Sequence, residues 1–237
     1  MTSSENAYLI ALQKIATGSL ALTELIDKAS GLSAAGQIEP ARQLYKAWIN
    51  GNGQHPLLFV AHFNCSALDS QAGDAKAAME ALNQAIALNA DFIPAYINLG
   101  GFLERSGATD KAIELWRSAV TRPLPITGNA VSHAATALKQ IARVLSDHQQ
   151  IEHAEAAVQH CLDIAPQQQD VMEQYIALRL SQCKWPIVVP SERIDRKSLV
   201  RGIHPLSMAV YTDDPMLQLA ASDRYSKYSP AEGPHAG

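Results

Sequence analysis

The sequence repeats a pattern of residue types at a regular spacing of about 34 residues, and this repeat restricts the possible folds more than any other feature. One copy of the pattern holds Tyr96, Leu99, Gly100, Leu103, Gly107, Ala112, Trp116 and Ala119. The same slots one period earlier hold His62, Cys65, Ser66, Asp69, Gly73, Ala78, Leu82 and Ala85. Small residues recur where two packed helices would touch, so the spacing predicts stacked helix pairs.

Small residues and turn residues within each copy predict two helices, A and B. Ala78 and Ala112 fall where A and B cross, because a close crossing needs small side chains between large apolar ones. Gly73 and Gly107 are expected to end helix A, since glycine accepts the positive φ of a tight turn. Asp74 then lies near the start of helix B, where a carboxylate suits the helix dipole.

Two further copies match the pattern with insertions. The earlier copy holds Leu25, Lys28, Ala29, Leu32, Gly36, Ala41 and Tyr45, before a lengthened connection over residues 50–54. The later copy holds Leu138, Ile141, Ala142, Leu145, Ala154, Val158, Cys161 and Pro166. An eight-residue enlargement over residues 122–129 precedes it, and Pro123 and Pro125 predict a non-helical loop there. Residues 171–181 are expected to form helix A of a fifth unit without its partner.

This pattern resembles the tetratricopeptide repeat, a helix-turn-helix unit with the same period. The resemblance implies an all-α fold, a right-handed superhelix or helix-turn-helix solenoid with a short C-terminal connector. We expect an N-terminal capping helix in residues 1–18, with the helix itself over residues 6–16. About four units and a terminal helix follow over residues 19–182, then a connector of short helices and loops over residues 183–237, disordered from Ser226 onward. An unrelated bundle of Ala-rich helices is the alternative, but the regular offset argues against it.

In tetratricopeptide superhelices helix A lines a concave groove, and the resemblance implies that the slot just before the helix A core residue points into it. In this chain the slot holds Asp27, Asn64, Asn98, Gln140 and Gln174. A carboxamide both donates and accepts, so a row of them can bind the N–H and C=O groups of an extended peptide. We therefore predict a groove for proteins or peptides. The alternative is that these residues are simply solvated helix positions.

A neighbouring slot tests the two-lysine clamp by which some tetratricopeptide co-chaperones hold a C-terminal carboxylate. The slot holds Phe63, Ile97 and Lys139. One basic residue does not make a clamp, so we do not expect one. Trp48, Phe92 and Trp116 fall at interhelical spacings and are expected in the core.

The character of the sequence changes at Cys183. A helix-ending Cys-Lys-Trp-Pro segment over residues 183–186 is followed by a Pro-Leu-Ser stretch at 205–207 and an Asp-Asp-Pro segment at 213–215. This order resembles the bacterial SPINDLY-type relatives of O-linked N-acetylglucosamine transferases, in which these segments precede the catalytic lobes. The sequence reaches Gly237 before nucleotide-sugar-binding lobes could begin, so the resemblance implies a binding arm without catalytic residues.

Chemically conspicuous residues have structural interpretations. Asp214 before Pro215 is typical of a helix N-cap, and His204 of a structural loop. His153 and His160 share a predicted helix face but lack further ligands at zinc spacing, so no metal site and no cofactor are expected. Cys65 and Cys161 fall at packing slots. No nucleophile elbow, P-loop, zinc-protease motif or dinucleotide fingerprint occurs, so no catalytic residue is assigned.

The charge and hydropathy of the chain argue against nucleic acid and membranes as partners. With 19 Lys and Arg against 23 Asp and Glu, the chain has no basic excess for nucleic acid. No run approaches the roughly 20 apolar residues that cross a membrane, and the N-terminus does not resemble a signal peptide. Three widely spaced cysteines fit neither a disulfide framework nor a zinc cluster, which favours a reducing cytoplasm.

Together these patterns favour protein recognition. The resemblance implies the substrate- or partner-recognition arm of a SPINDLY-like glycosyltransferase, and a stand-alone tetratricopeptide adaptor or scaffold is the alternative. An enzyme with its site in the tail is a third hypothesis, and association into a homo-oligomer is left open.

Overall fold

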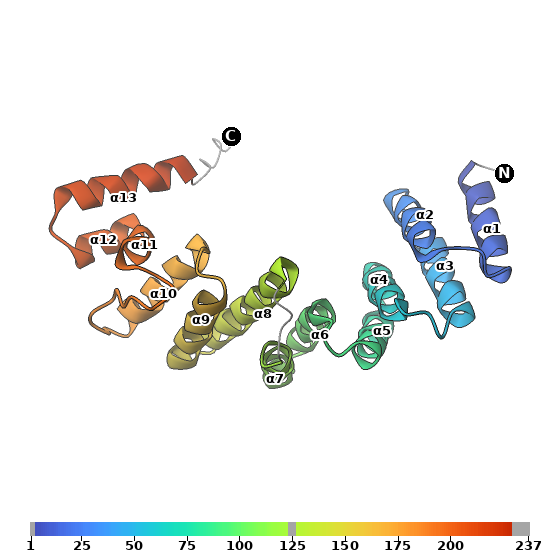
Figure 1. The fold of residues 1–237 in the computed structure, drawn as a ribbon, viewed down its shortest axis with the longest axis horizontal. Helices are drawn as coiled ribbons and strands as arrows, with labels where there is room; N and C mark the ends of the chain where they lie inside the picture. Colours follow the sequence, from blue (N-terminus) through green and yellow to red (C-terminus); the bar gives the residue numbers. More distant parts are fainter. Residues whose placement is uncertain (1–2, 123–126, 229–237) are drawn as a thin grey trace. The chain divides into compact units, whose positions relative to one another are not determined.

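A computed structural model describes residues 3–122 and 127–228 of the chain, and every regular element within this part is an α-helix (Figure 1). The chain divides into two compact units, residues 1–124 and 125–237. The division falls within the enlarged segment before the fourth predicted repeat. Each unit is described by itself.

The first unit consists of α1 (Ser3–Ala16) and three helix pairs. The pairs are α2 (Leu22–Ala34) with α3 (Ile38–Gly51), α4 (Leu58–Gln71) with α5 (Ala75–Leu88), and α6 (Ile93–Arg105) with α7 (Thr109–Val120). They coincide with the first three predicted repeats, so the A and B helices are confirmed there. Helix α1 packs on α2 and α3 and buries Ala11 and Ile15.

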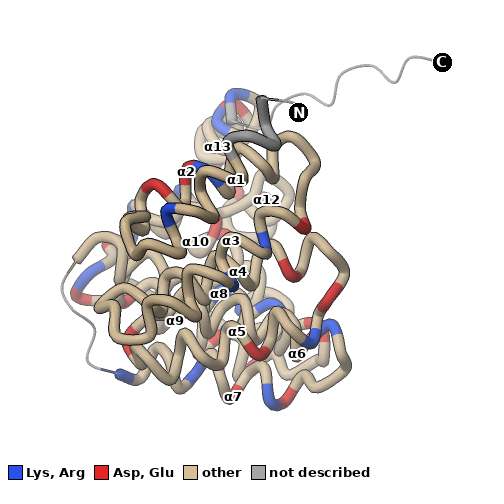
Figure 2. Tube along the Cα trace, turned by 90° about the vertical axis from the view of Figure 1, so that its right-hand side faces the viewer, with Lys and Arg blue, Asp and Glu red and all other residues tan. Residues whose placement is uncertain are grey.

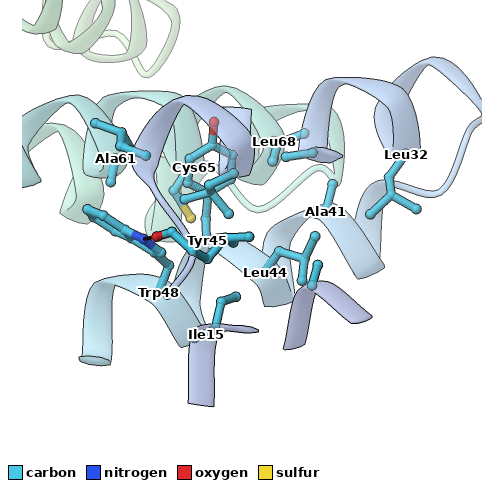
Figure 3. Close-up of a cluster of buried hydrophobic side chains, with 14 of the residues drawn as sticks. Ile15, Leu32, Ala41, Leu44, Tyr45, Trp48, Ala61, Cys65 and Leu68 are labelled. Atoms are coloured by element: carbon cyan, nitrogen blue, oxygen red, sulfur yellow. Dashed lines mark hydrogen bonds between the residues drawn. The ribbon is translucent and has the colours of Figure 1, made fainter. Parts of the chain in front are cut away.

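A core cluster of the first unit joins α1, α2, α3 and α4 (Figure 3). Trp48 of α3 lies at its centre, and its Nε1 donates a hydrogen bond to the Leu20 carbonyl oxygen at 2.9 Å. Leu44 and Tyr45 of α3 pack with Cys65 of α4. Helix α3 packs on both α2, the helix A of its own repeat, and α4, the helix A of the next repeat. Its large apolar and small side chains are therefore both buried.

Small residues occupy the helix crossings, as the repeat predicts. Ala41, Ala78, Ala112 and Ala154 are fully buried. At Gly100 even a methyl group is excluded, because a Cβ there would overlap the indole ring of Trp116. The buried tryptophan and the glycine opposite it are complementary in size.

The A helices end in one recurring turn. The N–H of Gly73 bonds to the Ser70 carbonyl, and the N–H of Asp74 to the Asp69 carbonyl. The same pair of bonds follows α2, α6, α8 and α10, where the residue with positive φ is Gly36, Gly107, Gln149 and Cys183, respectively. This is the Schellman end of a helix, which favours glycine but does not require it. Since Cys183 occupies the same slot of the repeat as Gln149, α10 ends as a helix A does.

The second unit holds the remaining helices. They are α8 (Gly128–Asp147), α9 (Ile151–Ile164), α10 (Gln169–Ser181), α11 (Arg196–Arg201), α12 (Pro205–Tyr211) and α13 (Pro215–Tyr228). Helices α8 and α9 form the fourth pair, and α10 packs on α9 as a fifth helix A.

The prediction of a loop over residues 122–129 is wrong at its end. Residues 123–126 lie outside the described part, but α8 already begins at Gly128, where Thr127 accepts a hydrogen bond from the Ala130 N–H at 3.3 Å. Thr127 is the N-cap of α8, so the helix begins three residues after Pro125. Helix α8 therefore has 20 residues, against 13 in α6 and α10, and the insertion is partly helix.

The tail packs against α10. Gly202 lies so close to Met172 that a Cβ would approach the Met172 Cβ to 2.8 Å, and Gln169 Nε2 donates to the Arg201 carbonyl oxygen at 2.9 Å. Ile187 and Leu199 are fully buried. The segment expected to be disordered from Ser226 begins inside α13, and residues 229–237 lie outside the described part.

The tail helices start at capped positions. His204 Nδ1 accepts a hydrogen bond from the Leu206 N–H at 3.3 Å, and Asp214 Oδ1 accepts one from the Met216 N–H at 2.9 Å. Pro205 and Pro215 follow these caps as the first helical residues. Both conspicuous side chains therefore have structural roles.

Charged residues of both signs are scattered along the described trace (Figure 2). Two clusters of them are buried. In the first unit Arg42 Nε donates to Asp69 Oδ1 at 2.7 Å, and Arg42 Nη2 to Asp74 Oδ2 at 3.1 Å. In the second unit Glu155 accepts from Arg179 Nη1 and from Lys184 Nζ, each at 2.7 Å. Each cluster ties a B helix to the helix A that follows.

Candidate functional site

A cavity of about 400 Å³ lies between α2 and α4, the A helices of the first two repeats. Apolar and small side chains line it together with five residues that carry polar side-chain groups. The apolar and small ones are Ile26, Ala29, Ala34, Ala67 and Leu68. The polar ones are Ser30, Ser33, Tyr45, Asn64 and Gln71. Its position between successive A helices is the position that the repeat predicts for a groove.

Asn64 lines this cavity together with Tyr45. Burial raises the pKa of Tyr45 to about 12, although the neighbouring Asn64 carboxamide acts in the opposite direction. The phenol is therefore protonated at neutral pH, and its hydroxyl can donate as well as accept. Tyr45 is 3% exposed, so it is the half-buried Asn64 carboxamide that offers a bound chain both a donor and an acceptor.

The far end of the cavity carries a second polar pair. Ser33 Oγ of α2 donates to Gln71 Oε1 of α4 at 3.1 Å, so this bond spans the two helices. The Gln71 NH2 group still has donors to offer. Polar groups thus occur at intervals along the wall of the cavity.

The predicted groove residues of the first unit are in different surroundings. Asn64 is half-buried in the cavity, whereas Asp27 on α2 and Asn98 on α6 are exposed and lie outside its lining. On α2 the cavity is lined by Ser30 and Ser33 instead. Sequence reasoning missed these serines, although the small residues around Ala29 and Ala67 indicate where two helices leave space between them.

The predicted groove residues of the second unit are half-buried. Gln140 on α8 accepts hydrogen bonds from Arg143 Nε at 3.2 Å and Nη2 at 3.1 Å. Its carbonyl oxygen is therefore engaged within its own helix. The Gln174 side chain on α10 makes no hydrogen bond to another described residue. Of the five predicted groove residues, Asp27, Asn64 and Asn98 lie in the first unit, and Gln140 and Gln174 lie in the second.

The neighbouring slot contains no clamp in the described residues. Lys139 Nζ pairs with Asp170 Oδ2 at 3.0 Å and is neutralised by it. Phe63 packs edge-on against Phe92, with ring centroids 5.1 Å apart, and Phe59 packs against Phe92 in the same way at 5.0 Å. This slot thus holds an aromatic residue, Phe63, in the second repeat and an ion-paired lysine, Lys139, in the fourth.

The described residues hold no cluster of three His, Cys, Asp or Glu side chains that could bind a metal ion. His153 and His160 are exposed. Burial raises the pKa of the Cys65 thiol to about 12 and that of Cys161 to about 11, so neither is a thiolate at neutral pH. None of the described helices combines the length and the apolar character needed to cross a bilayer.

Comparisons with known proteins show the fold. No protein-family model matches the chain, and no curated protein matches it. Among solved structures, the C-terminal part of a TPR repeat-containing protein from Cytophaga hutchinsonii superposes with a TM-score of 0.64 at 9% identity, covering 97% of this chain and 92% of that one. PilF of Pseudomonas aeruginosa gives 0.56 at 12% identity, covering 97% and 95%.

A third solved structure is YrrB, described as a TPR protein with an unusual peptide-binding site. It gives a TM-score of 0.50 at 14% identity and covers 90% of this chain and 97% of that chain. At such identities the likeness concerns the fold alone. The chain therefore has a tetratricopeptide-repeat fold, and the comparisons do not extend to membership of the SPINDLY-type family.

Proposed function

We propose that the chain is a protein-binding module that holds an extended peptide in the cavity between α2 and α4. The observation that carries this proposal is that the carboxamide residues Asn64 and Gln71 line that cavity beside two serines. A carboxamide can serve the N–H and the C=O of one peptide unit at the same time. A volume of about 400 Å³ suits a few residues of an extended chain rather than a folded domain.

The lining also supports sequence-tolerant binding. Backbone hydrogen bonds supply affinity without reading side chains, and the apolar Ile26 and Leu68 beside the polar groups accept varied apolar side chains. The description of YrrB as a peptide-binding TPR protein supports the same kind of ligand. Asp27 and Asn98 would extend such a site within the first unit, and Gln140 and Gln174 would form a corresponding surface on the A helices of the second unit.

The experiment is a selection from a random peptide display library on the full chain, followed by fluorescence anisotropy with the selected peptides. We expect Asn64→Ala combined with Asn98→Ala to weaken binding at least fivefold, since each lost hydrogen bond costs about 1 kcal/mol. Far-UV circular dichroism should show unchanged helicity. Asn83→Ala on α5 is the control, because Asn83 is an exposed asparagine of a B helix. Equal affinity in all three proteins would contradict the proposal.

Two versions of this function differ in the partner. As the recognition arm of a SPINDLY-like glycosyltransferase, the module would hold many substrates. As a stand-alone adaptor it would hold one partner or a few. A pull-down from native extract with the Asn64/Asn98 variant beside the wild type separates them: many partners lost together favour the arm, and a single lost partner favours the adaptor.

A further inference from the structure

A second cavity, of about 440 Å³, lies among the short helices of the tail. Its floor is apolar and consists of Val200, Met208, Leu217 and Ala220. Met208 is fully buried, whereas Leu217 is 39% exposed, so the floor continues from the core of the tail to the surface. Helices α11, α12 and α13 all contribute to it (Figure 1).

The remaining four residues of the lining are all positively charged. Helix α11 supplies Arg196, Lys197 and Arg201, and α13 supplies Arg224. None of the four forms an ion pair with a carboxylate of the described residues, and Arg196 Nη2 instead donates to the Tyr211 hydroxyl at 3.0 Å. No acidic residue of the described part lines the cavity.

Two acids of the tail helices accept hydrogen bonds from residues outside the lining. Asp195 Oδ1 accepts the Ser198 N–H at 2.6 Å as the cap of α11, and Asp223 Oδ2 accepts from Lys227 Nζ at 2.7 Å. The four cations around the cavity have no carboxylate partner within its described lining. Their charge would be balanced by an anion, and the floor would be covered by an apolar group.

We propose that this cavity binds a small amphiphilic anion of the fatty-acid type, with a carboxylate held by the cations and an aliphatic chain on the apolar floor. Arginine suits this role because its planar guanidinium matches a carboxylate with two parallel hydrogen bonds. The volume lies in the range of small-molecule sites. This site is independent of the peptide cavity, which belongs to the other unit.

The test is a calorimetric titration of the full chain with decanoate below its micelle concentration. We expect saturable binding at one site, with octanoate about fifteenfold weaker because two buried methylenes are lost. Decanol, which has the chain without the charge, should bind at least tenfold more weakly than decanoate.

Variants separate this site from general charge effects. Arg201→Gln with Arg224→Gln should weaken decanoate binding at least tenfold. Lys76→Gln with Lys111→Gln removes the same charge from exposed positions of the first unit and should leave binding unchanged. Leu217→Ala should shorten the apolar contact and weaken decanoate more than octanoate.

Three results with these probes would overturn the proposal. They are equal binding of decanol and decanoate, equal binding by the wild type and the Arg201/Arg224 variant, and no saturation by any of these probes. Binding of an acidic, leucine-containing peptide in place of decanoate would also overturn it, and would assign the cavity to a protein partner.

Discussion

The two buried charge clusters occupy the same places in the repeat and have opposite signs. Arg42 directly follows the crossing residue Ala41 on α3, and Glu155 directly follows the crossing residue Ala154 on α9. Along the repeat Asp69 corresponds to Arg179, and Asp74 corresponds to Lys184. A cation facing two acids in the first unit thus becomes an acid facing two cations in the second.

This inversion shows that the fold fixes the place of the charges and their complementarity, but not their sign. At the α5–α6 interface the corresponding residues are Met79, Leu103 and Ala108. The same three positions of the repeat can therefore also be occupied by apolar residues. The charged versions add specificity: α3 opposite an α10-type surface would place Arg42 against Arg179. Two buried like charges in such a contact would destabilise it, so the charges disfavour packing of α3 against the wrong helix A.

The largest expected effect is that of Arg42→Met. It leaves Asp69, whose side chain is 2% exposed, without its main partner, and the half-exposed Lys46 lies 3.9 Å away. We expect the free energy of unfolding of the first unit to fall by about 3–5 kcal/mol. Urea unfolding followed by the fluorescence of the buried Trp48 and Trp116 measures it. Arg117→Met, on an exposed position of α7, should cost far less; equal losses would contradict the account.

Inverting the whole first cluster sharpens the comparison. Arg42→Glu alone places three acids together, whereas Arg42→Glu with Asp69→Arg and Asp74→Lys reproduces the pattern of the second cluster. We expect the triple variant to regain about 2 kcal/mol or more relative to Arg42→Glu. Part of the loss should remain, because Asp74 also caps α5 by accepting the Ala77 N–H at 3.0 Å. A triple variant no more stable than the single one would show that the sign matters.

A smaller effect is expected for Glu155→Gln. Its partners are nearer to solvent, since the Lys184 side chain is 38% exposed, so they can be hydrated once the acid is gone. We expect a loss of about 1–3 kcal/mol, measured by urea unfolding followed by circular dichroism. A loss as large as that of Arg42→Met would contradict the difference in burial on which this comparison depends.

The same glutamate predicts a dependence on pH. Burial raises the pKa of Glu155, but hydrogen bonds from Lys184, Gln182 and Arg179 outweigh burial, and the pKa lies below its ordinary value of 4.5. The stabilisation is therefore complete above pH 4.5 and is lost as the pH falls through the lowered pKa. Glu155→Gln should remove this part of the acid sensitivity. An unchanged acid profile would show that Glu155 does not carry it.

The sequence predicts the helix pairs because small residues and glycines recur at crossings and turns. It does not predict Gln149 and Cys183 in the same turns, because neither residue favours positive φ and the surrounding packing imposes it. Asp69 stands where the next repeat has Leu103, which indicates a buried acid in need of a partner. Its partner Arg42 belongs to the preceding repeat, and only the packing of α3 on α4 brings them together.

The site can be predicted only in part for a similar reason. The slot pattern identifies Asn64, but it predicts only packing for Tyr45. Whether they line one cavity depends on how α2, α3 and α4 approach one another. Ser30 occupies no recurring polar slot. Ser33 and Gln71 fall in slots that are polar in most of the repeats, but exposed positions at the end of any helix A are polar too, so the pattern does not identify them as lining a cavity.

The most direct test of the peptide site is an NMR titration of the ¹⁵N-labelled full chain with a peptide selected on it. The account predicts that the side-chain NH2 signals of Asn64 and Gln71 shift as the peptide saturates, together with the amides of Ser30 and Ser33. The NH2 signal of Asn83, on the opposite helix of the second repeat, should stay in place. Shifts around Asn83 with unchanged Asn64 and Gln71 signals would contradict the account.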